Sequence, residues 1–416
     1  MNWTQLFECA EQMIDEVLVE ARAQRQPLLL QPLTRSGSLL LLAVGCLWPF
    51  EVILDEKNLL QDEDAFRLDE SKIPSRLLPA AAWIQSDAEA PRLGFRLEDW
   101  QLTLCTSGST GEPKRIRKSG AGLLAEVHDL AELYQWTAQD AVLSLVSPLH
   151  IYGLLHSFLL PLYTRSTVEF VSFQEGPVDP ACIQHQSYAG VIGVPATWSF
   201  VKDLLACKSL GTLVMSGAPF GESRRRELQA LPQKPQRAWE ILGSTETGGL
   251  GFRSLLQRDD SFRCLKSVRI FERDGRQWVE SPYLQPETVW ELADRLELQA
   301  DGRFLHQGRS DRIFKYAGQR YALMEVEKSL SLCFQNAETL VRFHNDDAVA
   351  QGGWLEAWVE GEAGPADAAI RQSYRQSTRA PFPHVLHFMP RFPRDAQGKV
   401  QVCTGPMQER TNSPFP

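Results

Sequence analysis

Hydrophobic residues recur at helical spacing near the start of this 416-residue chain. Over residues 3–22, Leu6, Cys9, Met13, Ile14, Val17 and Leu18 share one face of an expected amphipathic helix. Its polar face is acidic rather than basic, which favours packing on the protein body over a membrane-surface role. The longest uncharged stretch, residues 36–50, is short for a membrane span and predicts a buried helix or strand.

From about residue 100, strand-like apolar runs alternate with helical stretches. The expected strands are 142–146, 168–173, 190–194, 212–215 and 238–242, and the helices between them include 154–162 and 197–205. This alternation predicts βα units, and therefore an α/β fold with a mostly parallel sheet flanked by helices.

Three polar, glycine-bearing loops follow predicted strands, at 106–111, 216–219 and 243–246. Ligands of open α/β sheets bind beyond the carboxyl ends of the strands. We therefore expect the three loops to converge at one end of one sheet.

Beyond residue 311 the segments are shorter and richer in Gly, Pro and charge. Helical spacing at 325–332 and 366–376, with strand patterns at 339–344 and 354–359, predicts a small α+β domain.

Composition narrows the functional classes. Apolar residues make up 43% and charged residues 23%, as in ordinary soluble globular proteins. The net charge of −9 argues against a nucleic-acid partner. The eight cysteines form no CxxC pair, so neither a zinc pattern nor a disulfide framework is expected. The acidic N-terminus does not resemble a signal peptide, and together these features predict a cytoplasmic protein without a membrane span.

Residues 106–114 carry the strongest chemical signal, Thr-Ser-Gly-Ser-Thr-Gly-Glu-Pro-Lys. Hydroxyls and unhindered backbone N–H groups suit polyphosphate oxygens, and Lys114 adds positive charge. A strand before the loop and helical spacing over 123–133 predict a strand–loop–helix phosphate site. An ordinary surface loop is the alternative, because the same residue types dominate turns. It is not a Walker loop, because no Gly-Lys-Ser/Thr closes it.

Four segments in order resemble the adenylate-forming superfamily, which includes acyl-CoA synthetases, carrier-protein-loading adenylation domains and luciferases. They are 106–114, Gly-Ser-Thr-Glu at 243–246, Gly-Arg-Ser-Asp-Arg-Ile-Phe-Lys-Tyr-Ala-Gly-Gln-Arg at 308–320, and Gly-Lys at 398–399. A weaker fifth segment, 147–153, resembles the acyl-pocket region of that family.

The resemblance implies two steps with ATP and Mg²⁺. A carboxylate attacks the α-phosphorus of ATP to give an acyl-adenylate and pyrophosphate. A thiol of CoA or of a carrier protein's phosphopantetheine then displaces AMP. It also implies a large domain over 1–310 with a reduced front part (1–100), a hinge at Asp311, and a rotating lid domain over 312–416.

Residue roles follow from the same resemblance. Lys399, Glu246, Thr245 and His150 would be catalytic, with Glu246 also the Mg²⁺ ligand and Thr245 on the α-phosphate. The nucleotide site would comprise Thr106, Ser107, Gly108, Ser109, Thr110, Gly111, Lys114, Ser216, Gly217, Ala218, Pro219, Gly243, Ser244, Asp294, Arg309 and Arg320. The hinge and thiol step would use Asp311, Lys315 and Gly318. Tyr152, Val194 and Ser216–Ala218 would line the acyl pocket with His150.

Each role has a plain structural alternative. Lys399 could be an exposed turn residue, and Glu246 an acid favoured by a helix N-terminus. Asp294 and Arg309 could form a surface ion pair. Asp311 could be an ordinary loop residue, and His150 a structural histidine.

The chain departs from the family pattern at three places. Only 105 residues precede the phosphate loop, Leu242 stands where an adenine-stacking aromatic is usual, and Ala293 replaces the glycine before Asp294. The leading hypothesis is an acid–thiol ligase. Its short form resembles proteins of bacterial aryl-polyene pigment clusters, which favours an aromatic acid and a carrier protein. A fatty acid with free CoA, an enzyme that stops at the adenylate, and a binding module without turnover are the alternatives.

Overall fold

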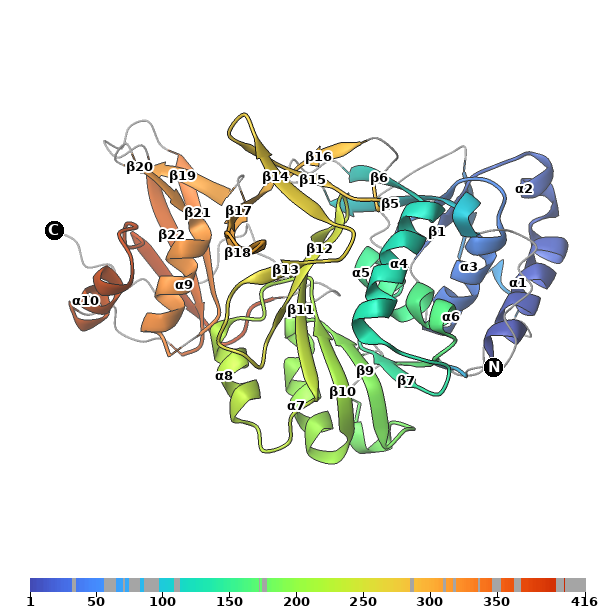
Figure 1. The fold of residues 1–416 in the computed structure, drawn as a ribbon, viewed down its shortest axis with the longest axis horizontal. Helices are drawn as coiled ribbons and strands as arrows, with labels where there is room; N and C mark the ends of the chain where they lie inside the picture. The colour runs from blue at the N-terminus through green and yellow to red at the C-terminus, as the bar shows by residue number, and fades with distance from the viewer. Residues whose placement is uncertain are drawn as a thin grey trace.

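The computed structural model is an α/β protein with two large sheets and a smaller C-terminal α+β region (Figure 1). This confirms the predicted fold class. The structure describes residues 1–31, 35–55, 65–69, 72–74, 83–85, 97–107, 113–171, 173, 178–284, 288–309, 312–316, 319–335, 337–345, 353–362, 368–393 and 400.

The front part of the chain forms helices α1 (Trp3–Val17), α2 (Val19–Ala23) and α3 (Arg35–Leu47). The helix expected over 3–22 is thus divided at Leu18, and the uncharged stretch is a helix, as one of the two expectations had it. Asn2 is the N-cap of α1, because its side chain accepts the Gln5 N–H at 2.8 Å. A five-stranded sheet in the order β3-β1-β2-β5-β6 accompanies these helices. Its strands are β1 (Leu28–Leu30), β2 (Val52–Leu54), β3 (Phe66–Leu68), β5 (Gln101–Ser107) and β6 (Pro113–Ser119).

The central sheet has ten strands in the order β17-β18-β13-β12-β11-β10-β9-β7-β8-β4. Five neighbours are parallel: β8 (Thr167–Phe170), β7 (Ala141–Ser144), β9 (Ser187–Gly193), β10 (Ser209–Met215) and β11 (Arg237–Ser244). These are the five strands that the sequence predicts. The flanking strands are antiparallel: β4 (Trp83–Ile84), β12 (Gly248–Ser254), β13 (Phe262–Cys264), β17 (Asp294–Leu298) and β18 (Arg303–Arg309).

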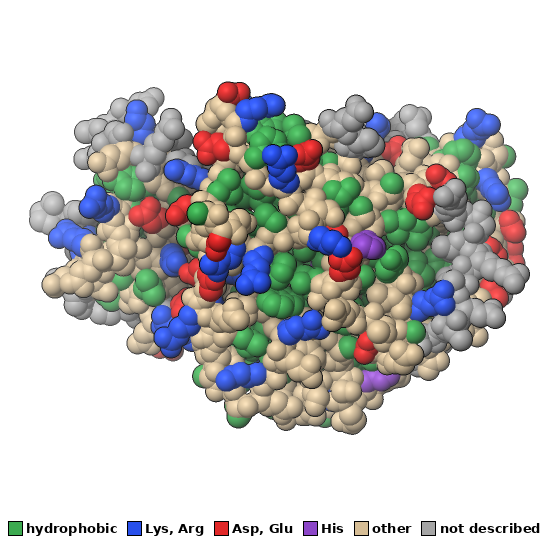
Figure 2. Space-filling model, viewed as in Figure 1, with side chains coloured by type: hydrophobic (Ala, Val, Ile, Leu, Met, Phe, Trp, Pro, Cys, Tyr) green, Lys and Arg blue, Asp and Glu red, His purple; other side chains and the backbone are tan. Residues whose placement is uncertain are grey.

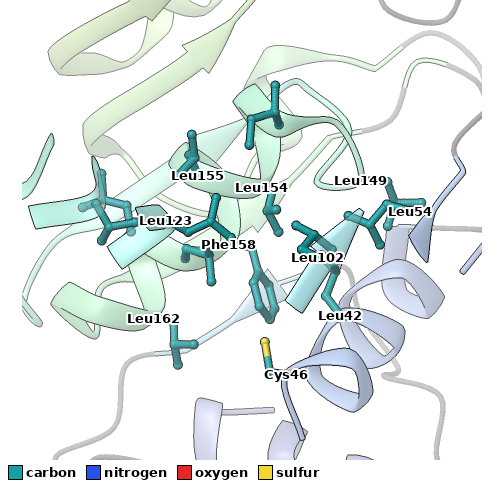
Figure 3. Close-up of a cluster of buried hydrophobic side chains, with 14 of the residues drawn as sticks. Leu42, Cys46, Leu54, Leu102, Leu123, Leu149, Leu154, Leu155, Phe158 and Leu162 are labelled. Carbon is teal, nitrogen blue, oxygen red and sulfur yellow. The ribbon is translucent and has the colours of Figure 1, made fainter. Parts of the chain in front are cut away.

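One hydrophobic core joins the two sheets (Figure 3). Phe158 is fully buried at its centre, facing Cys46 of α3 and Leu102 of β5. Burying one such side chain stabilises the fold by roughly 1.5–3 kcal/mol. The surrounding helical elements are α4 (Gly120–Tyr134), α5 (Ile151–Gly153), the π-helix η3 (Leu154–Leu159) and α6 (Leu160–Thr164). On the central sheet lie α7 (Trp198–Cys207) and α8 (Glu222–Ala230). Short 3-10 turns occupy Leu97–Asp99, Pro180–Cys182 and Pro195–Thr197.

The last third begins with an antiparallel sheet of β14 (Arg269–Arg273), β15 (Arg276–Glu280) and β16 (Val289–Glu291). The hairpin β19 (Ile313–Tyr316)–β20 (Gln319–Ala322) follows. Helices α9 (Leu323–Cys333) and α10 (Ala368–Ser377) share a core with β21 (Thr339–Asn345) and β22 (Gly353–Glu360), and β23 (Val385–Met389) completes their sheet. The predicted α+β texture beyond 311 is confirmed.

The expected strand–loop–helix arrangement at the phosphate loop is wrong. Strand β6 lies between the loop and α4 and pairs antiparallel with β5, placing Thr106 opposite Lys114. The described residues of the motif, 106, 107, 113 and 114, therefore lie on the paired strands β5 and β6 rather than at a helix N-terminus. The expectation that the three polar loops follow strands of one sheet is also wrong, because β5 belongs to the five-stranded sheet and β10 and β11 to the ten-stranded one.

The surface mixes charges of both signs (Figure 2). Basic and acidic side chains are interspersed over the face shown there. Among the residues that the structure describes, no helix is both long and apolar enough to cross a membrane.

Candidate active site

The β5–β6 hairpin meets the turn between β11 and β12 through an ion pair. Lys114 Nζ donates to Glu246 Oε1 at 2.7 Å. The structure thus joins two of the predicted site residues, although they come from different sheets.

The carboxylate of Glu246 is held in its ionised form. Burial alone would raise its pKa, but the hydrogen bond and charge of Lys114, together with hydrogen bonds from its own backbone and from Ser244, lower the pKa below its ordinary value. Glu246 is therefore negative at neutral pH while its side chain stays about one-quarter exposed. Such an oxygen ligand is what Mg²⁺ prefers.

The turn that carries Glu246 is tightly shaped. The Thr247 N–H donates to Ser244 Oγ at 3.1 Å, and the Ser244 and Thr247 hydroxyls lie 3.0 Å apart. A Cβ at Gly243 would lie 2.5 Å from the Gly248 carbonyl oxygen, so glycine is needed for this close approach. Thr245 is buried in the turn. The hydroxyl of Ser244 thus supports the turn, and the backbone of Gly243 is exposed beside it.

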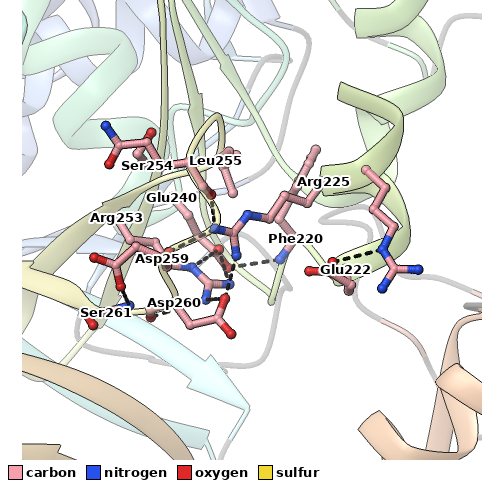
Figure 4. Close-up of polar contacts among 12 residues, drawn as sticks. Phe220, Glu222, Arg225, Glu240, Arg253, Ser254, Leu255, Asp259, Asp260 and Ser261 are labelled. Carbon is pink, nitrogen blue, oxygen red and sulfur yellow. Dashed lines mark hydrogen bonds and ion pairs between the residues drawn. The ribbon is translucent and has the colours of Figure 1, made fainter. Parts of the chain in front are cut away.

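The loop 216–219 is fastened to β11 at both ends. Ser216 Oγ donates to the Ile241 carbonyl at 2.9 Å, and the Phe220 N–H donates to Glu240 Oε1 at 2.9 Å. Arg253 holds Glu240 in turn, at 2.7 Å, within the polar network of Figure 4. Gly217 has a positive φ of 83°. Gly217, Ala218 and Pro219 are exposed, so this backbone is open to a ligand.

The predicted acyl-pocket residues share one region. Val194 is the residue that a Cβ at Gly217 would meet, at 3.4 Å. Tyr152 is buried, with its hydroxyl 3.1 Å from the Gly193 carbonyl and 3.0 Å from the Val214 carbonyl, at the ends of β9 and β10. His150 is partly buried at the start of α5.

His156 is a buried histidine that the sequence reasoning did not single out. Its Nδ1 lies 3.0 Å from the Tyr152 carbonyl oxygen and its Nε2 lies 3.1 Å from the Tyr134 hydroxyl. The sequence feature that could have identified it is a histidine within the mostly apolar run 154–160, four residues after Tyr152. It fixes the π-helix against α4.

Acid should weaken the fold through His156. Burial lowers the pKa of His156 from 6.5 to about 4, although the Tyr152 carbonyl opposes the shift. The unfolded chain therefore binds a proton that the folded chain excludes, and the stabilisation is complete above pH 6.5 and is lost as pH falls toward 4. Between pH 7 and pH 5 we expect this histidine to remove roughly 2 kcal/mol from the free energy of unfolding.

Urea denaturation of the wild type and His156→Gln at both pH values measures this effect. Glu126, whose pKa burial raises to about 7, acts in the opposite direction in both proteins, so the difference between them isolates His156. An equal pH dependence of the two proteins would contradict the prediction.

Asp294 and Arg309 occupy paired positions on β17 and β18. His306 Nε2 lies 2.8 Å from Asp294 Oδ1, and both side chains are mostly buried. His306 is a second residue that the sequence reasoning missed, because its partnership depends on the register of β17 against β18. It holds the Asp294 carboxylate in one orientation.

Of the remaining predicted residues, some lie within the described part of the chain and the others outside it. Thr106 is half-buried on β5, and Lys315 is exposed opposite Arg320 in the β19–β20 hairpin. Ser107 ends β5. The predictions for Gly108, Ser109, Thr110, Gly111, Asp311, Gly318 and Lys399 fall outside the described residues.

Comparisons with known proteins agree with the geometry. The chain belongs to the AMP-binding enzyme family, whose model matches residues 49–268. The 4-coumarate–CoA ligase of Cereibacter sphaeroides is 29% identical over 374 residues, covering 82% of this chain and 85% of that protein. A prolyl-carrier-protein ligase of Pseudomonas fluorescens is 24% identical, covering 74% and 69%. The o-succinylbenzoate–CoA synthetase MenE of Bacillus subtilis, solved with ATP and magnesium, shares the fold at a TM-score of 0.72 and 16% identity, covering 95% and 92%.

The family resemblance is thereby confirmed, and with it the expectation of an AMP-forming acid–thiol ligase of the acyl-CoA synthetase type. The donor set fits Mg²⁺ held mainly by nucleotide phosphates. Among the described residues no group of three His, Cys, Asp or Glu side chains could hold a metal by itself, and Glu246 offers one ionised carboxylate. One or two carboxylates with phosphate oxygens is the usual mode for this ion.

Proposed function

We propose that this ligase activates an aromatic carboxylic acid and transfers it to the thiol of CoA or of a carrier-bound phosphopantetheine. A carboxylate oxygen attacks the α-phosphorus of ATP, and pyrophosphate leaves. The thiol sulfur then attacks the acyl carbon, the bond to AMP breaks, and the thiol proton is released. We also propose the cytoplasm as its compartment, on the cysteine pattern of the sequence.

The ion pair between Lys114 and Glu246 is the observation that carries the proposal. It places an ammonium group and an ionised carboxylate side by side where the hairpin and the turn meet. A triphosphate needs a cation for its oxygens, and its bound Mg²⁺ needs a carboxylate. Glu246 would hold Mg²⁺, which supplies charge neutralisation on the phosphates.

Other residues would bind and orient the nucleotide. Asp294, fixed by His306, suits two ribose hydroxyls as acceptor. The exposed backbone of 217–219 suits the adenine side, next to the ends of β10 and β11. Arg309 and Arg320 would supply guanidinium donors, and Lys399 would reach the α-phosphate from a lid domain over 312–416 that turns about Asp311.

Two relatives support different details of the substrates. The ligase of Cereibacter sphaeroides acts on 4-coumarate, an aromatic acid, and spans most of this chain. The Pseudomonas protein loads a carrier protein, which supports a carrier as the acceptor.

Pyrophosphate exchange with a panel of aromatic, short, medium and long carboxylic acids tests the proposal. We expect exchange that depends on an aromatic acid, followed by thioester formation on CoA or a phosphopantetheinylated carrier. Exchange with aliphatic acids alone would overturn the aromatic assignment. Release of AMP and pyrophosphate that no thiol accelerates would favour an adenylate-forming enzyme.

Leu242 favours one further candidate, a module that binds nucleotide without turnover. It packs on the hydrophobic core where a stacking aromatic is usual in the family. ATP binding without exchange for any acid of the panel would support that candidate.

A further inference from the structure

Two lysines on one face of β6 hold the same residue of the neighbouring turn. Lys114 donates to the Glu246 carboxylate, whereas Lys118 Nζ donates to the Glu246 backbone carbonyl at 2.8 Å. Residues four apart in a strand share a face, with Ile116 between them. Lys114 is half-exposed, but Lys118 is only 5% exposed. A buried ammonium on a backbone carbonyl points to a role in holding this turn.

The other end of the turn rests on a buried carboxylate. Glu126 of α4 is 3% exposed, and its Oε1 accepts the Gly249 N–H at 2.6 Å. Gly248 has a positive φ, and a Cβ there would overlap Glu126 Oε2. The turn from 246 to 249 is therefore held by the Lys118 ammonium group at its beginning and by a Glu126 carboxyl oxygen at its end.

The two buried charges support each other. The charge of Lys118 lowers the pKa of Glu126 against the effect of burial, and the charge of Glu126 raises the pKa of Lys118 in the same way. Buried charges are costly to desolvate, and a hydrophobic pair of similar size often serves stability equally well. Their cost is offset here by hydrogen bonds to the backbone of the turn, which an apolar pair would not make.

We infer that Lys118 and Glu126 are positioning residues that fix the 246–249 turn, so that the Glu246 carboxylate is presented to the magnesium–nucleotide. This inference rests on the proposed role of Glu246. Neither side chain needs to touch the substrate. A displacement of about 1 Å in a positioned group costs on the order of 10²-fold in rate, which makes the support measurable.

Lys118→Met removes the ammonium and keeps most of the side-chain volume. We expect the KM for MgATP to rise at least tenfold and the Mg²⁺ concentration for half-maximal exchange to rise with it, while the KM for the acid changes less than twofold. Glu126→Gln keeps an amide oxygen for the Gly249 N–H and should show a smaller change in the same direction. Arg117→Met is the matched control, because Arg117 lies on the opposite face of β6 and is 76% exposed.

Hydrogen exchange of a peptide covering 245–249 gives a readout apart from activity. We expect faster exchange in Lys118→Met than in wild type without nucleotide, with unchanged exchange in β9 and β10. Three results would each overturn the inference: unchanged hydrogen exchange in the turn, an unchanged KM for MgATP, or equal increases in the KM of MgATP and of the acid. If Lys118→Met does not fold, the Glu126→Gln comparison decides in the same way. Failure of the proposed role of Glu246 would appear differently: Glu246→Gln and wild type would then show the same rate of pyrophosphate exchange.

Discussion

Replacing Lys399 with alanine is expected to reduce acyl-adenylate formation by about 10²–10³-fold, the usual effect of losing one preorganised stabilising group. Attack on the α-phosphorus builds negative charge on the phosphoryl oxygens, and a lysine carried by a closing lid would stabilise it where water is excluded. The same residue would lie elsewhere in the thiol step, because the proposed lid would rotate between the two steps. Thioester formation from a supplied acyl-adenylate should therefore stay near the wild-type rate.

Two assays separate the half-reactions. Acid-dependent pyrophosphate exchange reports the first, and conversion of synthetic acyl-adenylate with CoA reports the second. Arg391→Ala is a suitable control, because Arg391 is an exposed cation near the same end of the chain. Equal losses in both half-reactions would contradict the division of labour, and a variant with normal exchange would remove Lys399 from the mechanism.

Glu246→Gln is expected to lower kcat/KM for MgATP by about 10²-fold. The amide oxygen can still accept from Lys114, so the turn is retained, but the negative charge offered to Mg²⁺ is lost. Raising free Mg²⁺ should recover part of the activity, because a weakened metal site fills at higher concentration.

Titration of Mg²⁺ at fixed ATP in the exchange assay measures this effect. Glu132→Gln provides a control, since Glu132 is a surface carboxylate paired with Lys266. The same Mg²⁺ dependence in Glu246→Gln and wild type would take Glu246 out of the metal site.

The central strands were predictable because several of them are short buried runs. The run 212–215 is buried at every position, and its short length and β-branched residues favour a buried strand, as in parallel sheets. The helices α7, α9 and α10 were likewise predictable from apolar residues at helical spacing. The polar, glycine-bearing segment 216–219 follows β10 as predicted, and Gly243 and Ser244 lie at the end of β11.

The sequence could not predict β6, because charged residues on both faces of the strand remove the usual alternation of apolar and polar positions. Four of its seven residues are Lys or Arg, and the buried side of the strand is built from Lys118 as well as Ile116. Lys118 becomes a buried residue only through acceptors on a distant turn. Sequence spacing carries no sign of such a partner.

The partners of the candidate site were missed for a similar reason. His306 contacts Asp294 from the neighbouring strand, and Glu126 contacts Gly249, which lies 123 residues further along the chain. These pairs depend on register and tertiary packing, whereas the motif residues themselves stand next to one another in the sequence. Motifs therefore predicted the candidate site, and the structure added the residues that contact it.

The charge of β6 also bears on how ATP would reach the proposed nucleotide site. The chain as a whole is negative and would repel ATP at long range. Lys114 points to the turn of the proposed nucleotide site, whereas Arg117 projects from the other face of the strand and pairs with Glu51. We expect the Lys114 ammonium to oppose that repulsion within a Debye length of about 8 Å at physiological ionic strength. Salt that screens this local attraction should slow the capture of ATP.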